Sequence, residues 1–97
     1  MFDVADLISE ETAVDNIGNE IKKQSENEVF IEVASVSQNE FYKSAQSGLR
    51  PEYKFTLFSA DYGGQEKIRY NDAVYYVYRT YEKDEKTELY VTKKAVI

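Results

Sequence analysis

The sequence predicts a mainly β protein, a small β-barrel with one short helix, and three observations lead to that prediction. Short segments rich in β-branched and aromatic residues recur at roughly 8–12-residue spacing between turn residues, as in small barrels. Only residues 37–51, a long excursion between two strands, change from the period of a strand to that of a helix. Hydrophobic residues make up 42% of the 97 residues, which suffices for one core. We therefore expect a single domain over residues 1–97.

The first part of the chain predicts weak strands before one clear strand. The first strand has Phe2, Val4 and Ile8 as its apolar positions, and polar residues follow it. We expect a short strand at 2–8, a loop or wide hairpin turn at 9–19, an edge strand at 20–24, a second turn at 25–27 and a strand at 28–36.

One segment predicts a short helix over residues 38–46. Ser37 and Glu40 have the spacing of a capping box, in which the serine caps the backbone and the glutamate reaches back to it. Gly48 is suited to the end of the helix, and Pro51 prevents it from continuing.

The second part of the chain predicts strands joined by tight turns. Asn71-Asp72 is a hairpin turn pair, because both residues tolerate positive φ angles. The following strand is rich in tyrosine, with five of them in residues 70–81. We expect strands at 52–58, 66–70, 73–81 and 87–92, with turns at 61–64 and 83–86.

Alternation along these strands predicts which side chains face inward. The expected core residues are Val29, Ile31, Val33, Tyr53, Phe55, Leu57, Ile68, Tyr75, Val77, Leu89 and Val91. Tyr76 and Tyr78 then point outward, which leaves two aromatic side chains for a partner.

Charge is divided unevenly along the chain. The net charge is −6, and residues 1–40 hold ten acids and two bases, whereas residues 41–97 hold eight acids and ten bases. One interpretation is a solvated acidic surface. The other is a subunit whose acidic side meets the more basic side of an identical neighbour, a head-to-tail contact that can close into a ring.

The composition argues against catalysis, metal binding and cofactor binding. Histidine and cysteine are both missing, which removes the commonest general base, metal ligand and nucleophile. The carboxylate pairs Glu10-Glu11 and Asp84-Glu85 fall in predicted turns, where nothing raises a pKa. We expect no enzyme, no metal and no cofactor. No apolar run approaches the roughly 20 residues of a membrane helix, so no membrane contact is expected.

Exposed tyrosines leave two classes of partner open. Tyr76, Tyr78 and Arg79 could stack on single-stranded nucleic acid, as in small barrels of that function. The acidic balance lacks the basic groove that such proteins use, so protein–protein contact is favoured.

An ordered series of residues resembles one protein family. The series comprises Glu40-Phe41-Tyr42, Ala45, Gly48-Leu49-Arg50-Pro51-Glu52, Lys54-Phe55, Asp61-Tyr62, Gly64, Lys67-Ile68-Arg69-Tyr70, Tyr75, Val77, Arg79-Thr80-Tyr81 and Glu88-Leu89. Between Val29 and Lys93 the chain resembles the head–tail connector proteins (head-closure or stopper proteins) of long-tailed bacteriophages and of prophages in Gram-positive bacteria. The family often has a glycine where this chain has Asp72-Ala73.

The resemblance implies a structural virion protein at the neck, assembled in the cytoplasm of the host bacterium. Its small β-barrels form a ring, typically dodecameric, below the portal or its adaptor and above the tail terminator or tail tube. The ring completes the head, helps to retain packaged DNA and offers the tail a docking surface, while DNA passes without sequence-specific binding. Another phage ring protein, such as a tail terminator or portal adaptor, is the first alternative, and a small barrel binding single-stranded nucleic acid is the second.

The resemblance also implies roles for particular residues. In a well-studied relative class, a loop between strands narrows the channel, and residues 37–51 match it here. The channel candidates are Lys43, Ser44, Gln46, Ser47, Gly48 and Arg50. Tyr76 and Tyr78 are the expected subunit-interface residues, and Phe41, Tyr42 and Leu49 are expected to anchor the excursion at such an interface.

Overall fold

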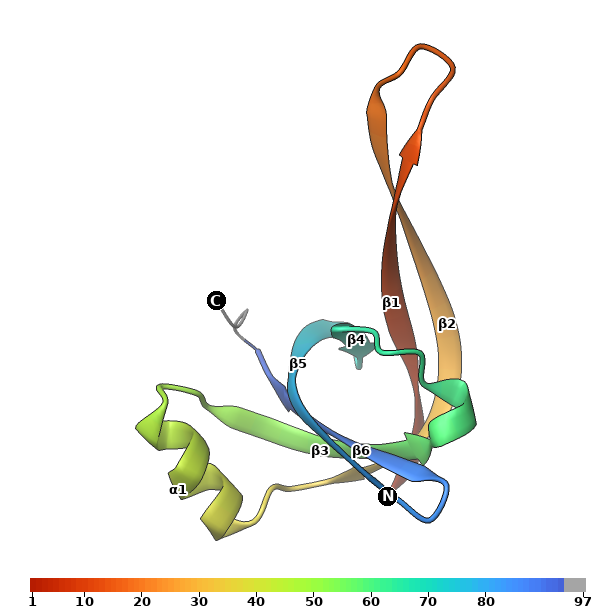
Figure 1. The fold of residues 1–97 in the computed structure, drawn as a ribbon. Coiled ribbons are helices and arrows are strands. Elements are labelled where there is room, and N and C mark those ends of the chain that lie inside the picture. Colours follow the sequence, from red (N-terminus) through yellow and green to blue (C-terminus); the bar gives the residue numbers. More distant parts are fainter. Residues whose placement is uncertain (94–97) are drawn as a thin grey trace.

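The strands close into a barrel in which paired neighbours run antiparallel. The structure, a computed structural model, describes residues 1–93, and within them the order around the barrel is β1-β2-β3-β6-β5-β4, with β4 pairing back onto β1 (Figure 1). The elements are β1 (Phe2–Val14), β2 (Glu20–Ala34), α1 (Gln38–Gln46), β3 (Pro51–Phe58), a 3₁₀ turn η1 (Ser59–Asp61), β4 (Lys67–Tyr70), β5 (Ala73–Lys83) and β6 (Lys86–Thr92). The predicted β-barrel with one short helix between strands is confirmed.

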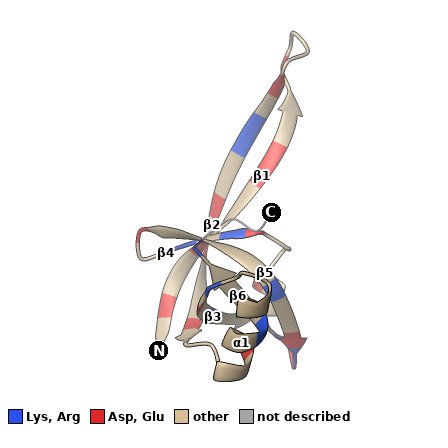
Figure 2. Ribbon diagram, turned by 90° about the vertical axis from the view of Figure 1, so that its left-hand side faces the viewer, with Lys and Arg blue, Asp and Glu red and all other residues tan. Residues whose placement is uncertain are grey.

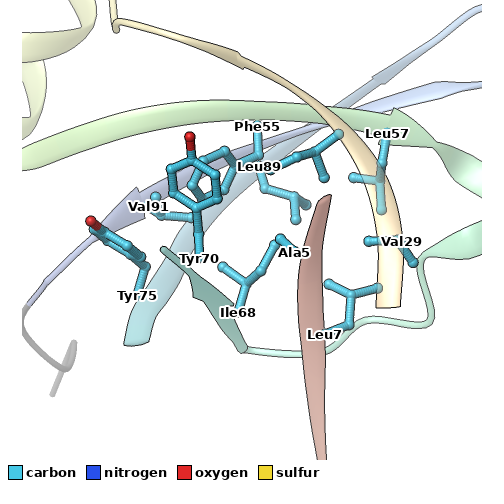
Figure 3. Close-up of a cluster of buried hydrophobic side chains, with 11 residues drawn as sticks. Ala5, Leu7, Val29, Phe55, Leu57, Ile68, Tyr70, Tyr75, Leu89 and Val91 are labelled. Atoms are coloured by element: carbon cyan, nitrogen blue, oxygen red, sulfur yellow. The ribbon is translucent and has the colours of Figure 1, made fainter. Parts of the chain in front are cut away.

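Inward-facing side chains from all six of these strands form the core (Figure 3). The most deeply buried are Leu7, Ile31, Phe55, Ile68, Leu89 and Val91. Most of the predicted core residues lie here, and Val33, Tyr53 and Val77 pack against it as partly buried residues. Sequence analysis missed Ala5, Leu7 and Tyr70.

Four aromatic rings occupy one end of this core. Tyr53 stacks on Phe55 with ring centroids 5.6 Å apart, and Tyr70 and Tyr75 meet both rings edge-on. The Tyr70 hydroxyl donates a hydrogen bond of 3.1 Å to Asp3. Edge-on ring pairs of this kind contribute roughly 0.5–1.5 kcal/mol beyond their buried area.

The first strand turns its small apolar residues inward. Ala5, opposite Val29, is buried, whereas Phe2 and Val4 are exposed. Because side chains alternate along a strand, pairing with β2 places Phe2 and Val4 on the outer face. Of the three apolar positions expected for this strand, Phe2 and Val4 are thus exposed, whereas Ile8 is buried.

Beyond the barrel, β1 and β2 continue as a long hairpin, here called the arm (residues 9–25). The predicted loop at 9–19 and turn at 25–27 are wrong. The two strands stay paired from Ser9 opposite Ser25 to Val14 opposite Glu20, and only residues 15–19 turn. The arm extends away from the barrel (Figure 1), in a molecule of 52 × 28 × 25 Å. Polar side chains made this ribbon look like a loop, because a strand exposed on both faces lacks apolar alternation.

Both tight turns in the second half have the expected backbone. Asn71 and Asp72 have φ angles of 52° and 65°, and Asp84 and Glu85 have 53° and 66°. Two successive positive φ angles define the turn whose twist matches that of the flanking strands. The hairpins β4–β5 and β5–β6 follow from these pairs.

The excursion begins and ends with helix caps. The Ser37 hydroxyl accepts a hydrogen bond of 3.2 Å from the Glu40 backbone N–H, and α1 covers the predicted residues 38–46. Gly48 has a φ of 79°, and its N–H donates to the Ala45 carbonyl while Leu49 N–H donates to the Ser44 carbonyl. This is the glycine-dependent end that sequence analysis predicted.

Glu85→Gly is expected to stabilise the barrel. A left-handed backbone costs a non-glycine residue roughly 1–2 kcal/mol, and the freedom of glycine in the unfolded chain offsets part of the gain. The free energy of unfolding in urea should rise by about 0.5–1 kcal/mol. The control Glu82→Gly places glycine in extended β5 and should lower it. A lower value for Glu85→Gly would contradict the turn geometry.

Candidate functional site

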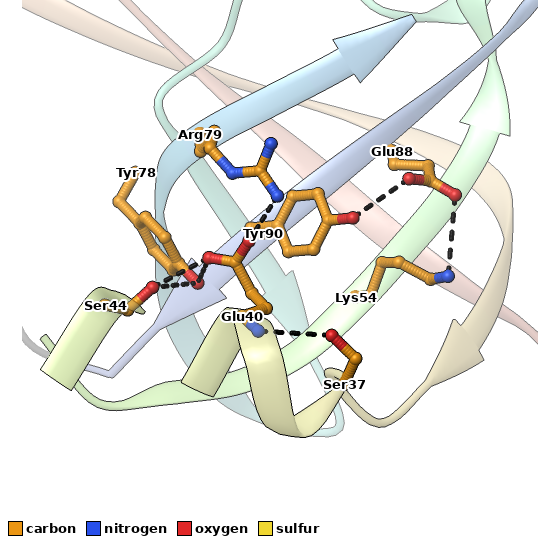
Figure 4. A network of polar contacts seen from close by, with 8 residues as sticks. All are labelled: Ser37, Glu40, Ser44, Lys54, Tyr78, Arg79, Glu88 and Tyr90. Atoms are coloured by element: carbon orange, nitrogen blue, oxygen red, sulfur yellow. Dashed lines mark hydrogen bonds and ion pairs between the residues drawn. The ribbon is translucent and has the colours of Figure 1, made fainter. Parts of the chain in front are cut away.

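The carboxylate of Glu40 ties α1 to the barrel (Figure 4). The Ser44 hydroxyl donates to Glu40 Oε2 at 2.7 Å, and the Tyr78 hydroxyl donates to the same oxygen at 3.0 Å. The Arg79 guanidinium pairs with the other oxygen, Oε1. The Glu40 side chain retains only 11% of its exposure. A carboxylate so far removed from water needs such donors, and two of them come from β5.

A β-bulge in β5 brings Tyr78 and Arg79 to this carboxylate together. Val77 lies opposite Val91 and Arg79 opposite Tyr90, so Tyr78 is an extra residue in the ladder. Bulges re-aim side chains in this way. The Arg79 guanidinium also lies 4.0 Å from the ring centre of Tyr90, a cation–π contact that fixes its direction.

Glu40 does not complete the predicted capping box. Its backbone N–H receives the Ser37 cap, but its carboxylate bonds Ser44, Tyr78 and Arg79 and does not reach back to Ser37. The Glu40 carboxylate therefore contacts the barrel and does not cap the N-terminus of its own helix.

The network shifts the pKa values of its members. Burial opposes ionisation of Glu40, but hydrogen bonds from Ser44, Tyr78 and Arg79 outweigh it and lower the pKa of this carboxyl below its ordinary value. Burial, with the neighbouring Glu40 charge, raises the pKa of Tyr78 to about 12. At neutral pH the network therefore holds one carboxylate, one protonated phenol and one guanidinium.

An open hollow of about 400 Å³ lies beside the network. Its lining residues are Glu40, Lys43, Ser44, Ser47, Leu49, Tyr78 and Arg79. The structure thus brings together residues from both predicted groups, the interface candidates Tyr78 and Leu49 and the channel candidates Lys43, Ser44 and Ser47.

The predicted site residues of the excursion differ in how they are exposed. Phe41 and Tyr42 are exposed, so they do not anchor the excursion within the chain. Ser44 is buried against Glu40, which removes it from the free polar tip that sequence analysis expected. The remaining channel candidates, Gln46, Gly48 and Arg50, are exposed.

Tyr76 and Tyr78 both lie on the outside of the barrel but in different surroundings. Tyr76 is partly buried, with the Lys67 ammonium 5.9 Å from its ring centre. Tyr78 lies beneath the chain's own helix, and its hydroxyl oxygen is 3.2 Å from that of Ser44. That either residue contacts a neighbouring subunit stays a prediction.

Two exposed apolar surfaces were missed by sequence analysis. The aromatic patch, formed by Phe2, Val4, Phe30 and Phe58, lies on the outer face of β1, β2 and β3, where Phe2 keeps 83% and Phe30 77% of their exposure. The second surface is the arm tip (residues 13–21), which exposes Val14, Ile17 and Ile21. The sequence did contain an indication of the patch, namely the apolar residues Phe2, Val4 and Phe30 at outward positions of β1 and β2.

Ion pairs with β4 hold the base of the arm. The Lys67 ammonium lies 2.6 Å from Glu10 Oε1, and Arg69 pairs with Glu26. The hydrogen bond and charge of Lys67 lower the pKa of Glu10. Glu10, from one of the two carboxylate pairs considered above, is therefore part of this brace.

Among residues 1–93, no group of three or more acidic side chains is placed to hold a metal ion. No buried side-chain nitrogen or oxygen in that range lacks a hydrogen-bond partner. In the same range, no helix is long and apolar enough to cross a membrane.

No protein-family model and no curated protein matches the chain.

Undocking of α1 is expected on acidification. The pKa of Glu40 is lowered in the folded chain, so the ionised carboxylate stabilises the docked helix fully at neutral pH. This stabilisation is lost as the pH falls through the folded-state pKa of Glu40. Protection of the amides of α1 against hydrogen exchange should then fall while the barrel stays protected.

The variant Glu40→Gln should lose that protection at every pH. Hydrogen bonds to a charged group contribute about 1.5–3 kcal/mol, so protection should fall about 10-fold or more. Glu82→Gln, at an exposed position of β5, is the matched control and should behave like the native chain. Unchanged protection in Glu40→Gln would contradict the network's role.

Proposed function

We propose that this chain is a head–tail connector subunit of a long-tailed bacteriophage or prophage. In that role it forms a ring that completes the head, helps to retain packaged DNA and gives the tail a docking surface. The resemblance between Val29 and Lys93 suggests this function. A small barrel with a helix in the excursion between β2 and β3 agrees with the fold that the resemblance implies.

The observation that carries the proposal is the number of separate apolar surfaces on one small chain. The aromatic patch, the arm tip, and Phe41 with Tyr42 on α1 each expose large apolar side chains in different parts of the molecule (Figure 1). Exposed apolar patches mark contact surfaces. A ring subunit between two layers needs several of them, for its two neighbours and for the layers above and below.

The charge of the chain suits a channel for DNA. A net charge of −6 repels phosphates, so DNA can pass without binding to the wall. The excursion is the candidate for the segment that narrows the channel, because its helix is held to the barrel mainly through one carboxylate.

A nucleic-acid-binding barrel fits these contacts less well. Arg79 is paired with Glu40 and stacked on Tyr90, and Tyr78 is covered by α1, so two of the three proposed stacking residues are occupied. The other ring proteins, a tail terminator or a portal adaptor, share the need for several contact surfaces and differ in the particle to which they bind.

Deleting the gene from the phage or prophage should yield heads that retain packaged DNA poorly and free tails that do not join. Adding the purified chain to these heads should restore tail attachment, counted by electron microscopy. Tails that join normally without the chain would overturn the proposal. Restoration through binding to isolated tails instead of heads would favour the tail terminator.

Binding to single strands provides the second test. A labelled single-stranded oligonucleotide should stay unbound at low salt, where phosphate contacts are strongest. Tight binding at low salt that is lost at high salt would favour the nucleic-acid alternative.

A further inference from the structure

The arm has no partner for most of its length within the described chain. Between residues 9 and 25 its two strands pair only with each other, whereas β4 reaches β1 only up to Ile8. A two-stranded hairpin alone is marginally stable in water. The arm is therefore suited to lie against another molecule, and its tip offers Val14, Ile17 and Ile21 for that contact.

The arm tip is acidic as well as apolar. Residues 13–21 contain Asp15 and Glu20 and no lysine or arginine. Lys22 and Lys23 lie just below the tip, and Figure 2 shows them as the basic stretch of the arm, with acidic positions along the hairpin. A surface that covers the tip should thus combine apolar side chains with positive charge.

The excursion has these properties. Its acid, Glu40, is neutralised by Arg79, whereas Lys43 and Arg50 have no ion-pair partner among residues 1–93. Phe41 and Tyr42 are exposed on the same short helix. The excursion therefore offers two aromatic rings and two uncompensated positive charges to the aliphatic side chains and the two acids of the tip.

The aromatic patch is a poorer match for the tip. The charged residues that border its hollow, Glu32 and Lys86, have opposite signs and give no net attraction for acids. Its exposed phenylalanines remain available for another layer of the assembly.

The tip and the excursion of one chain point in different directions. In Figure 1 the arm rises from the barrel, and α1 lies at the far lower side. A contact between them must therefore join two copies, head to tail, which is the type of contact that generates rings.

We propose that the arm tip of one subunit docks on the excursion of the next subunit. The proposal rests on the ring-forming function above and names the surfaces through which the ring closes. Val14 and Ile17 pack against Phe41 and Tyr42, while Asp15 and Glu20 face Lys43 and Arg50. Glu20 lies opposite Val14 in the ladder and therefore shares its face.

Charge reversal tests the pairing. The tip variant Asn16→Lys with Glu20→Lys makes the net charge of residues 13–21 positive but keeps Asp15, whose carboxylate accepts hydrogen bonds from the Ile17 and Asn19 N–H groups in the turn. This variant and the excursion variant Lys43→Glu with Arg50→Glu should each remain monomeric in sedimentation, because each sets surfaces of like net charge against each other. An equimolar mixture should regain the oligomer, since each variant then complements the other. If the variants assemble alone, or if the mixture does not assemble, the proposal is overturned.

Cysteine cross-linking tests the contact directly, because the native chain contains no cysteine. The double variant Ile17→Cys with Tyr42→Cys should give a ladder of disulfide-linked oligomers on oxidation. The controls are each single variant and Ile17→Cys with Phe58→Cys, which probes the aromatic patch. The proposal is overturned if the first pair gives no ladder, whether the chain stays monomeric or associates through another surface. It is also overturned if the pair with Phe58→Cys gives the stronger ladder.

The tail-joining assay separates this inference from the proposed function. Heads that join tails equally well with either charge-reversed variant would leave the connector function standing and overturn the tip–excursion contact. Rings that form and cross-link as expected but do not restore tail joining would support the contact and overturn the function.

Discussion

The Glu40 carboxylate is the group on which the position of the excursion depends. An ionised carboxylate nearly removed from water must receive hydrogen bonds, and the bulge in β5 delivers two donors at once, Tyr78 and Arg79. The same pairing has an electrostatic consequence. Because Arg79 neutralises Glu40, Lys43 and Arg50 are left to give the excursion a positive surface. The docking of the helix and the positive surface of the excursion thus have one origin.

Elements defined by local chemistry could be predicted from the sequence. The turn pair Asn71-Asp72, the serine cap of α1 and the glycine at its end each act within four residues, and all were found where expected. The arm could not be predicted, because its strands are exposed on both faces and carry no apolar alternation. Its existence depends on pairing between residues far apart in the sequence, such as Val4 with Phe30, that continues outward from the barrel.

The candidate site was predictable only in part, for a similar reason. Outward placement of Tyr78 followed from alternation, but its partner Glu40 lies 38 residues earlier, and the local capping rule assigned that carboxylate to the wrong group. Nor does alternation reveal a bulge, which brings Arg79 to the same carboxylate as Tyr78. The aromatic patch could be predicted only if the inward face of β1 were known. The buried residues Ala5 and Leu7 indicate that face less clearly than the exposed Phe2 and Val4 suggest the opposite one.

The brace at the arm base bears on the geometry of any ring. The ladder of β1 and β2 continues from the barrel into the arm, and Lys67 and Arg69 tether Glu10 and Glu26 at its base from the side of β4. In the head-to-tail contact that we propose, the angle between successive subunits depends on the direction of the arm. The number of subunits in the proposed ring therefore depends on the arm base as well as on the tip.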